Sequence, residues 1–129
     1  MIDRPQDLLY SRRHLWVRKD DNDCLAEVGI TEELQELLPE IVSIDVPVIG
    51  DEIEIEQPCI HVYYQDGIRH IRAPLSGKII GVNRDVLSNP QLLHLSFYTN
   101  WLFQLEYDEE SELEMLLACD EYVNYLESL

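Results

Sequence analysis

Positive charge is scarce in this chain. Nine lysine and arginine residues stand against 26 aspartate and glutamate residues among 129, which gives a formal net charge of -17. Only two of the basic residues are lysines, Lys19 and Lys78. An acidic surface repels phosphate groups, so the composition excludes nucleic acid and anionic membranes as partners and favours docking to basic patches on proteins. A solvated acidic surface without a specific partner is the alternative interpretation.

The sequence also lacks the cysteine patterns that are typical of disulfide frameworks and zinc sites. Cys24, Cys59 and Cys119 are odd in number, far apart, and form no Cys-x-x-Cys pair. We therefore expect three reduced thiols in a cytoplasmic protein. No apolar run is long enough to cross a bilayer, and residues 1–10 show no signal-peptide pattern.

What the chain does contain is enough apolar sequence for one core. Its length suits a single domain over residues 1–129, and 46% of the residues are hydrophobic. We expect the core at about residues 9–107 and a helical tail at 109–128. Alternation of apolar and polar residues predicts strands at His14–Arg18, Cys24–Val28, Ile41–Val48 and Gly50–Glu56, with the polar residues 20–23 as the turn between the first two.

Capping residues indicate where helices begin. Thr31 is a suitable N-cap for a helix over Thr31–Leu38, which Pro39 ends. Near the C-terminus, the capping box Ser111-x-x-Glu114 predicts one helix, and Asp120 predicts the start of another. A short echo, Pro-x-x-Gly-x-x-Ile, occurs in Pro47–Ile53 and again in Pro74–Ile80, which suits two similar half-sheets packed face to face.

Residues 59–72 read as a β-hairpin around Asp66-Gly67, a dipeptide that favours a two-residue type I′ turn. With these two residues as the turn, His70 faces Tyr63 and His61 faces Arg72. This pairing gathers no ligand cluster, so we expect no metal site. The same hairpin is locally basic, and its candidate docking residues are Tyr63, Tyr64, Arg69, His70 and Arg72. Plain cross-strand packing is the alternative interpretation for these side chains.

Several motifs in sequence order carry a resemblance to a known family. They are His14-x-Trp16-Val17, Val28-Gly29-Ile30-Thr31, Gly50-Asp51-Glu52-Ile53, Ala73-Pro74-Leu75-Ser76-Gly77-Lys78, Asn89-Pro90, and Ser111-Glu112-Leu113. In this order and spacing the chain resembles the glycine cleavage system H protein family over about Leu9–Leu126. The resemblance implies a monomer with a mostly β fold, a barrel-sandwich hybrid of the lipoyl-domain type, with a short helix in the N-terminal half and C-terminal helices. It also implies that His14 is a hydrogen-bonding residue and not a catalyst.

The family carries lipoate on a lysine at the tip of its arm hairpin. There the lipoate receives an aminomethyl group from glycine decarboxylase and presents it to the aminomethyltransferase. Counting back without gaps from Pro74–Gly77 places Asp66 at the position of that lysine. A carboxylate cannot form the amide that joins lipoate to an amine. We therefore expect no lipoate and no catalytic residue.

The hypothesis that follows is a non-enzymatic H-like protein that acts by docking, as a scaffold or regulator of glycine cleavage or other lipoyl-dependent enzymes. Two alternatives stay open. One is a working aminomethyl carrier with an unconventional attachment at Lys78 or a thiol, and the other is a small ligand-binding module that uses the 59–72 hairpin.

Overall fold

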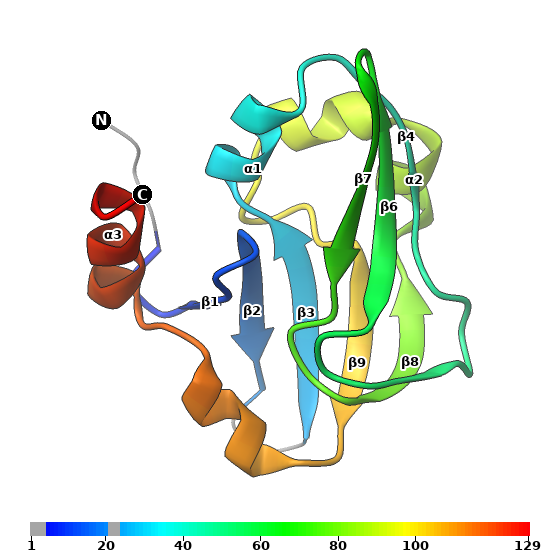
Figure 1. The fold of residues 1–129 in the computed structure, drawn as a ribbon. Helices are drawn as coiled ribbons and strands as arrows, with labels where there is room; N and C mark the ends of the chain where they lie inside the picture. The colour runs from blue at the N-terminus through cyan, green and yellow to red at the C-terminus, as the bar shows by residue number, and fades with distance from the viewer. Residues whose placement is uncertain (1–4, 21–23) are drawn as a thin grey trace.

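The computed structural model describes residues 5–20 and 24–129 as two antiparallel β-sheets packed face to face (Figure 1). The larger sheet has the strand order β1-β2-β3-β9-β8-β5, and the smaller sheet has the order β4-β6-β7. The strands of the larger sheet are Leu9–Tyr10 (β1), Leu15–Lys19 (β2), Leu25–Ile30 (β3), Phe103–Tyr107 (β9), Gly77–Val82 (β8) and Glu52–Ile53 (β5). Those of the smaller sheet are Ile41–Asp45 (β4), Pro58–Tyr64 (β6) and Gly67–Arg72 (β7). The expected mostly β sandwich is confirmed.

Short helices close the ends of this sandwich. The α-helices are Glu32–Leu37 (α1), Arg84–Ser88 (α2) and Cys119–Glu127 (α3), and the 3₁₀-helices are Pro90–His94 (η1) and Glu110–Met115 (η2). Helices α1 and α2 lie at the end of the molecule toward which the β6–β7 hairpin points, and α3 lies beside β1 (Figure 1). The sequence did not predict α2 and η1.

Within residues 5–20 and 24–129, no helix combines the length and the apolar character that crossing a membrane requires.

One of the three predicted caps is confirmed. Thr31 Oγ1 accepts a hydrogen bond from the Leu34 N–H at 3.3 Å at the start of α1. The other two predictions were wrong. Ser111 lies inside η2, whose N-cap position is Glu109 and has no side-chain cap. The neighbouring Glu112 accepts from the Ser76 N–H and hydroxyl at 2.8 Å each. Helix α3 begins before Asp120, and Glu121 Oε1 accepts from the Ala118 N–H at 2.8 Å.

The predicted strands form, but their boundaries differ. The strand expected over Gly50–Glu56 is reduced to the two residues of β5, and β4 ends at Asp45. Before β5, the Gly50 N–H donates to Ile79 O and the Ile79 N–H donates to Asp51 O, each at 2.8 Å, so the chain already pairs with β8 there. For the turn expected at 20–23, residues 21–23 lie outside the described residues.

The two copies of the Pro-x-x-Gly echo pair with each other. Glu52 lies opposite Lys78, and Ile53 lies opposite Gly77, so β5 and β8 bring the copies side by side at the edge of the larger sheet. Gly77 is required there, because its φ is +159° and a Cβ atom would overlap with the backbone of Glu106. The echo therefore predicted a related pair of bends, but both lie on one sheet.

The core has two parts. The larger part fills the space between the two sheets, and the smaller part lies between β1, β2 and α3. The buried residues of the smaller part are Leu8, Tyr10, Trp16, Leu117, Cys119 and Tyr122. The Tyr10 and Tyr122 rings stack with centroids 4.8 Å apart, and Trp16 Nε1–H donates to Phe97 O at 2.8 Å. The stacked tyrosines hold the C-terminal helix against the sheet, and the Trp16 bond ties β2 to the segment that follows η1.

Gly29 makes room for the Trp16 ring, since the two residues pair on β2 and β3 and a Cβ atom on Gly29 would overlap with the indole. We expect Gly29→Ala to lower the free energy of unfolding by about 1–3 kcal/mol, as overpacking does in other cores. Urea denaturation measures this. In a double-mutant cycle with Trp16→Leu the cost of Gly29→Ala should shrink; an unchanged cost would contradict the steric explanation.

Candidate functional site

The β6–β7 hairpin is the candidate site, and its register differs from the one that the sequence predicted. Tyr64 pairs with Gly67, so the two turn residues are Gln65 and Asp66 and not Asp66 and Gly67. The expected pairings of His70 with Tyr63 and of His61 with Arg72 were therefore wrong. A tertiary contact accounts for the shift, because the Gln65 N–H donates to Pro39 O at 3.2 Å, directly after α1. Gly67 keeps a positive φ of +149°, but as the first residue of β7.

Asp66 lies exposed at the tip of this hairpin, and neither lysine is near it in the chain or in the sheets. Lys78 lies in β8, between Glu52 on β5 and Glu106 on β9. Lys19 is the last residue of β2. The tip therefore presents a carboxylate where the attachment of lipoate needs an amine. The residues present at the tip do not fit the lipoyl group that the resemblance implies.

The outer face of the hairpin carries three of the five candidate docking residues. Tyr63 pairs with Ile68, and on a strand residues two apart share a face, so Ile68, His70 and Arg72 lie on the side of Tyr63. Tyr63 is 36% exposed and Ile68 is 50% exposed. An aromatic ring and an aliphatic side chain thus stand next to basic groups on a solvent-facing surface.

The other two candidates, Tyr64 and Arg69, lie on the inner face. Arg69 pairs with Val62, which is fully buried, and Tyr64 packs against the main core. The guanidinium of Arg69 also acts on His14: burial first, and then the charge of Arg69, lower the pKa of His14. The five predicted docking residues therefore divide between two faces and do not form one surface.

At the base of the hairpin, two arginine side chains bind Glu56. Arg72 Nη1–H donates to Glu56 O at 2.7 Å, and Arg13 Nη2 lies 3.2 Å from Glu56 Oε2. Glu56, whose carbonyl accepts this bond, has a positive φ of +69°. The Arg72 side chain is thus held at the base, whereas Arg69 lies three residues closer to the tip.

A buried polar cluster joins the turn before β2, the start of α1 and helix α3. His14 Nδ1 lies 2.8 Å from the Tyr122 hydroxyl, and Thr31 Oγ1 lies 3.3 Å from the same hydroxyl. Thr31 Oγ1–H lies 3.1 Å from His14 O, to which it donates. His14 is therefore a satisfied hydrogen-bonding residue, as the resemblance implied.

The thiols offer little for an attachment. Burial raises the pKa of Cys59 to about 12, so its sulfur stays protonated and weakly nucleophilic at neutral pH. Cys119 is also buried, and Cys24 is exposed. Cys24 directly precedes β3, and β3 begins at the end of the sandwich opposite the hairpin tip (Figure 1).

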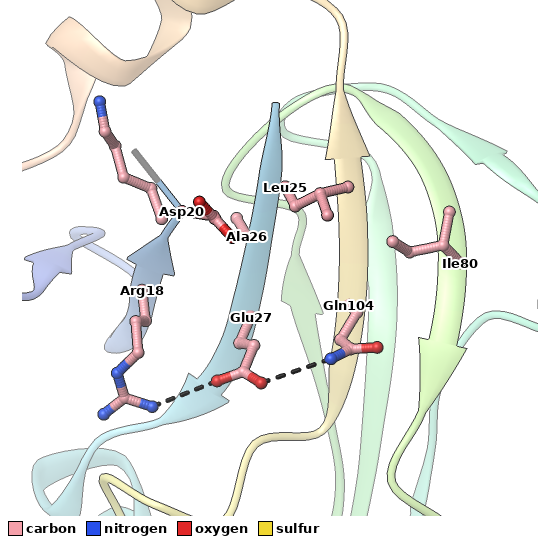
Figure 2. Close-up of a pocket in the computed structure, with 8 residues that line it drawn as sticks. Arg18, Asp20, Leu25, Ala26, Glu27, Ile80 and Gln104 are labelled. Carbon is pink, nitrogen blue, oxygen red and sulfur yellow. Dashed lines mark hydrogen bonds and ion pairs between the residues drawn. The ribbon is translucent and has the colours of Figure 1, made fainter. Parts of the chain in front are cut away.

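A hollow of about 390 Å³ lies on the larger sheet, across β2, β3, β9 and β8 (Figure 2). Three of its side chains form a connected row that sequence reasoning missed. Arg18 Nη1 lies 3.3 Å from Glu27 Oε1, and Gln104 Nε2–H donates to Glu27 Oε2 at 3.4 Å. Nothing in the sequence distinguished Arg18, Glu27 and Gln104 from other polar residues on strands. The hollow is remote from the hairpin, so it lends no support to a ligand site at 59–72.

The lowered pKa of His14 makes stability depend on pH. Because the folded protein binds the His14 proton more weakly than the unfolded chain, whose ordinary value is 6.5, the contribution of His14 is complete above pH 6.5 and is lost as the pH falls. We expect His14→Asn to reduce the acid-induced loss of unfolding free energy, since Asn tolerates the positive φ of +67° at this position. Denaturation between pH 7.5 and about 5 measures it. The exposed His94, changed to Asn, is the control, and equal effects of both variants would contradict the assignment.

Comparison with known proteins gives consistent results. Residues 8–129 match the family model of the glycine cleavage H-protein. The chain is 40% identical over 123 residues to the glycine cleavage system H protein of Photorhabdus laumondii, covering 95% of this chain and 94% of that protein. It is 35% identical over 124 residues to that of Oceanobacillus iheyensis, covering 95% and 97%. A crystal structure of a glycine cleavage system H protein from Mycobacterium marinum superposes with a TM-score of 0.82 at 25% identity, covering 98% of this chain and 100% of that one.

Proposed function

The chain belongs to the glycine cleavage H-protein family, and we propose that it acts within that system, or beside it, as an H-like protein without lipoate. The observation that carries this proposal is the exposed carboxylate of Asp66 at the hairpin tip, with both lysines held in strands of the other sheet. The protein keeps the scaffold that presents the arm but lacks the amine that the arm chemistry needs. Its role is then a non-catalytic one, as a scaffold or regulator.

The proposed partners are the enzymes that meet the arm of a lipoylated H protein: glycine decarboxylase, the aminomethyltransferase, or other enzymes of lipoyl systems. We propose that the protein docks to them as a cytoplasmic monomer through the β6–β7 hairpin. Tyr63 and Ile68 supply apolar contact on the outer face, and Arg69 supplies positive charge on the inner side. A surface with acidic groups that clasps the tip from both sides would complement this arrangement.

A working carrier with an unconventional attachment is less well supported. Lys78 lies on β8, next to the edge strand of the larger sheet, with Glu52 and Glu106 as its cross-strand neighbours, so its amine lacks the reach of a hairpin tip. Cys59 is buried and protonated, and Cys24 lies at the opposite end of the molecule. None of these groups lies at the hairpin tip, from which the family's lysine presents the tethered intermediate.

The absence of lipoate is tested by intact mass after incubation with a lipoate ligase, lipoate and ATP. We expect the wild-type protein to stay unmodified and Asp66→Lys to gain one lipoyl group, because the substitution places an amine at the exposed tip. Asp66→Asn is the control for removal of the negative charge alone and should stay unmodified. A lipoyl group on the wild-type protein that disappears in Lys78→Arg would overturn the proposal in favour of the alternative carrier.

The docking role is tested by binding to purified glycine decarboxylase and aminomethyltransferase. We expect the double variant Arg69→Glu/Arg72→Glu to weaken binding about tenfold or more, since both guanidinium groups are reversed in charge. Lys19→Glu/Arg84→Glu is the matched control, because it changes the net charge equally at exposed positions outside the hairpin. No binding of the wild-type protein to either enzyme, or equal losses in both variants, would contradict docking through the hairpin.

A further inference from the structure

The corrected register brings two histidines together on the outer face of the smaller sheet. His61 on β6 pairs directly with His70 on β7. Their Nδ1 atoms are 2.7 Å apart, and their rings meet edge to face with centroids separated by 4.9 Å. His70 is exposed and His61 is partly exposed, so solvent reaches the point where the two nitrogens converge.

From this geometry we propose that His61 and His70 form a solvent-accessible binding site for a divalent cation of the late first transition row. Among these cations, the site binds Cu²⁺ most tightly. Imidazole nitrogen is a preferred ligand of copper, nickel and zinc, and affinity for a given nitrogen site rises toward copper. Each neutral ring would offer its Nδ1 lone pair; the ring that donates the Nδ1–H in the hydrogen bond would change tautomer, so that its one N–H proton moves to Nε2.

The distances require little rearrangement. Metal–nitrogen bonds of about 2.0–2.1 Å at the right angle of the square-planar or tetragonal arrangement that Cu²⁺ prefers place the two nitrogens roughly 2.8–3.0 Å apart. The separation in the structure is 2.7 Å, so small rotations of the two side chains suffice. Both histidines are anchored on paired strands, which keeps the ligands in place before the cation arrives.

The surroundings favour a cation and leave space for water. Asp45 on β4 pairs with His61 from the other side, so a carboxylate neighbours the pair on the same face. His61 also lines a hollow of about 340 Å³ that contains Asp51 and Glu52. Within residues 5–20 and 24–129, no cluster of three potential ligand side chains exists, so water would complete the coordination of a bound cation.

Two neighbouring groups do not interfere. The Arg72 side chain, which shares the outer face, is bonded to Glu56 O at 2.7 Å at the base of the hairpin. Cys59 is buried with its pKa raised to about 12, so its sulfur does not compete as a thiolate ligand. The site therefore consists of imidazole nitrogen and water, and it stands independently of the docking role proposed above.

The test titrates tag-free protein separately with Cu²⁺, Ni²⁺ and Zn²⁺, using calorimetry and the histidine ring resonances in NMR spectra. We expect one Cu²⁺ per chain, weaker binding of the other two cations, and changes confined to the rings of His61 and His70. His61→Asn and His70→Asn should each weaken Cu²⁺ binding roughly tenfold or more, because each leaves a single imidazole. Both side chains reach solvent, so these variants should fold, which circular dichroism verifies.

His94→Asn is the matched control, since His94 is an exposed histidine on η1, outside the hairpin. It should bind Cu²⁺ as the wild-type protein does. Copper binding that persists in the double variant His61→Asn/His70→Asn would overturn the proposal, because it would place the cation on the acidic surface. Binding that is lost in His94→Asn, or absent from the wild-type protein, would overturn it equally.

Discussion

The register of the β6–β7 hairpin is the constraint on which the functional surface depends. The turn at Gln65 and Asp66, tied to Pro39 by a backbone hydrogen bond, determines which side chains share a face of the smaller sheet. A shift of pairing by one residue on each strand would separate His61 from His70 and give each a different neighbour. The separate pairing of β4 with β6 places Asp45 beside His61.

A buried cluster of polar side chains also stabilises the structure. His14, Thr31 and Tyr122 come from the turn before β2, the start of α1 and helix α3, and they meet at one buried hydroxyl. Burial without these partners would be costly for each of them, so the three elements are held in one arrangement. The cluster fixes the C-terminal helix and the start of α1, and the chain that leaves α1 provides the carbonyl that anchors the hairpin tip.

Scaffold and chemistry separate in this protein. The bends at Gly50 and Gly77 and the packing of Trp16 against Gly29 belong to the larger sheet, and the hairpin belongs to the smaller sheet that packs on it. The tip itself, however, ends in the carboxylate of Asp66. The match to the family model and the identity to its members establish the family, whereas the activity has to be argued from the residues at the tip. In a chain with a net charge of -17, Arg69 and Arg72 place two basic groups on the hairpin.

The sequence by itself determined the fold class, the family, the helix cap at Thr31 and the scarcity of amines, because apolar alternation, capping residues and motif order are local signals. It also located the hairpin, but it gave the wrong register, since Asp66-Gly67 is the stronger local turn and the contact with Pro39 is not local. The caps predicted at Ser111 and Asp120 also failed, because Ser111 lies inside η2 and because α3 begins one residue before Asp120, where Glu121 accepts from the Ala118 N–H. Only the tertiary structure decided that the five candidate docking residues divide between two faces and that His61 meets His70, because pairing between strands depends on contacts from distant parts of the chain.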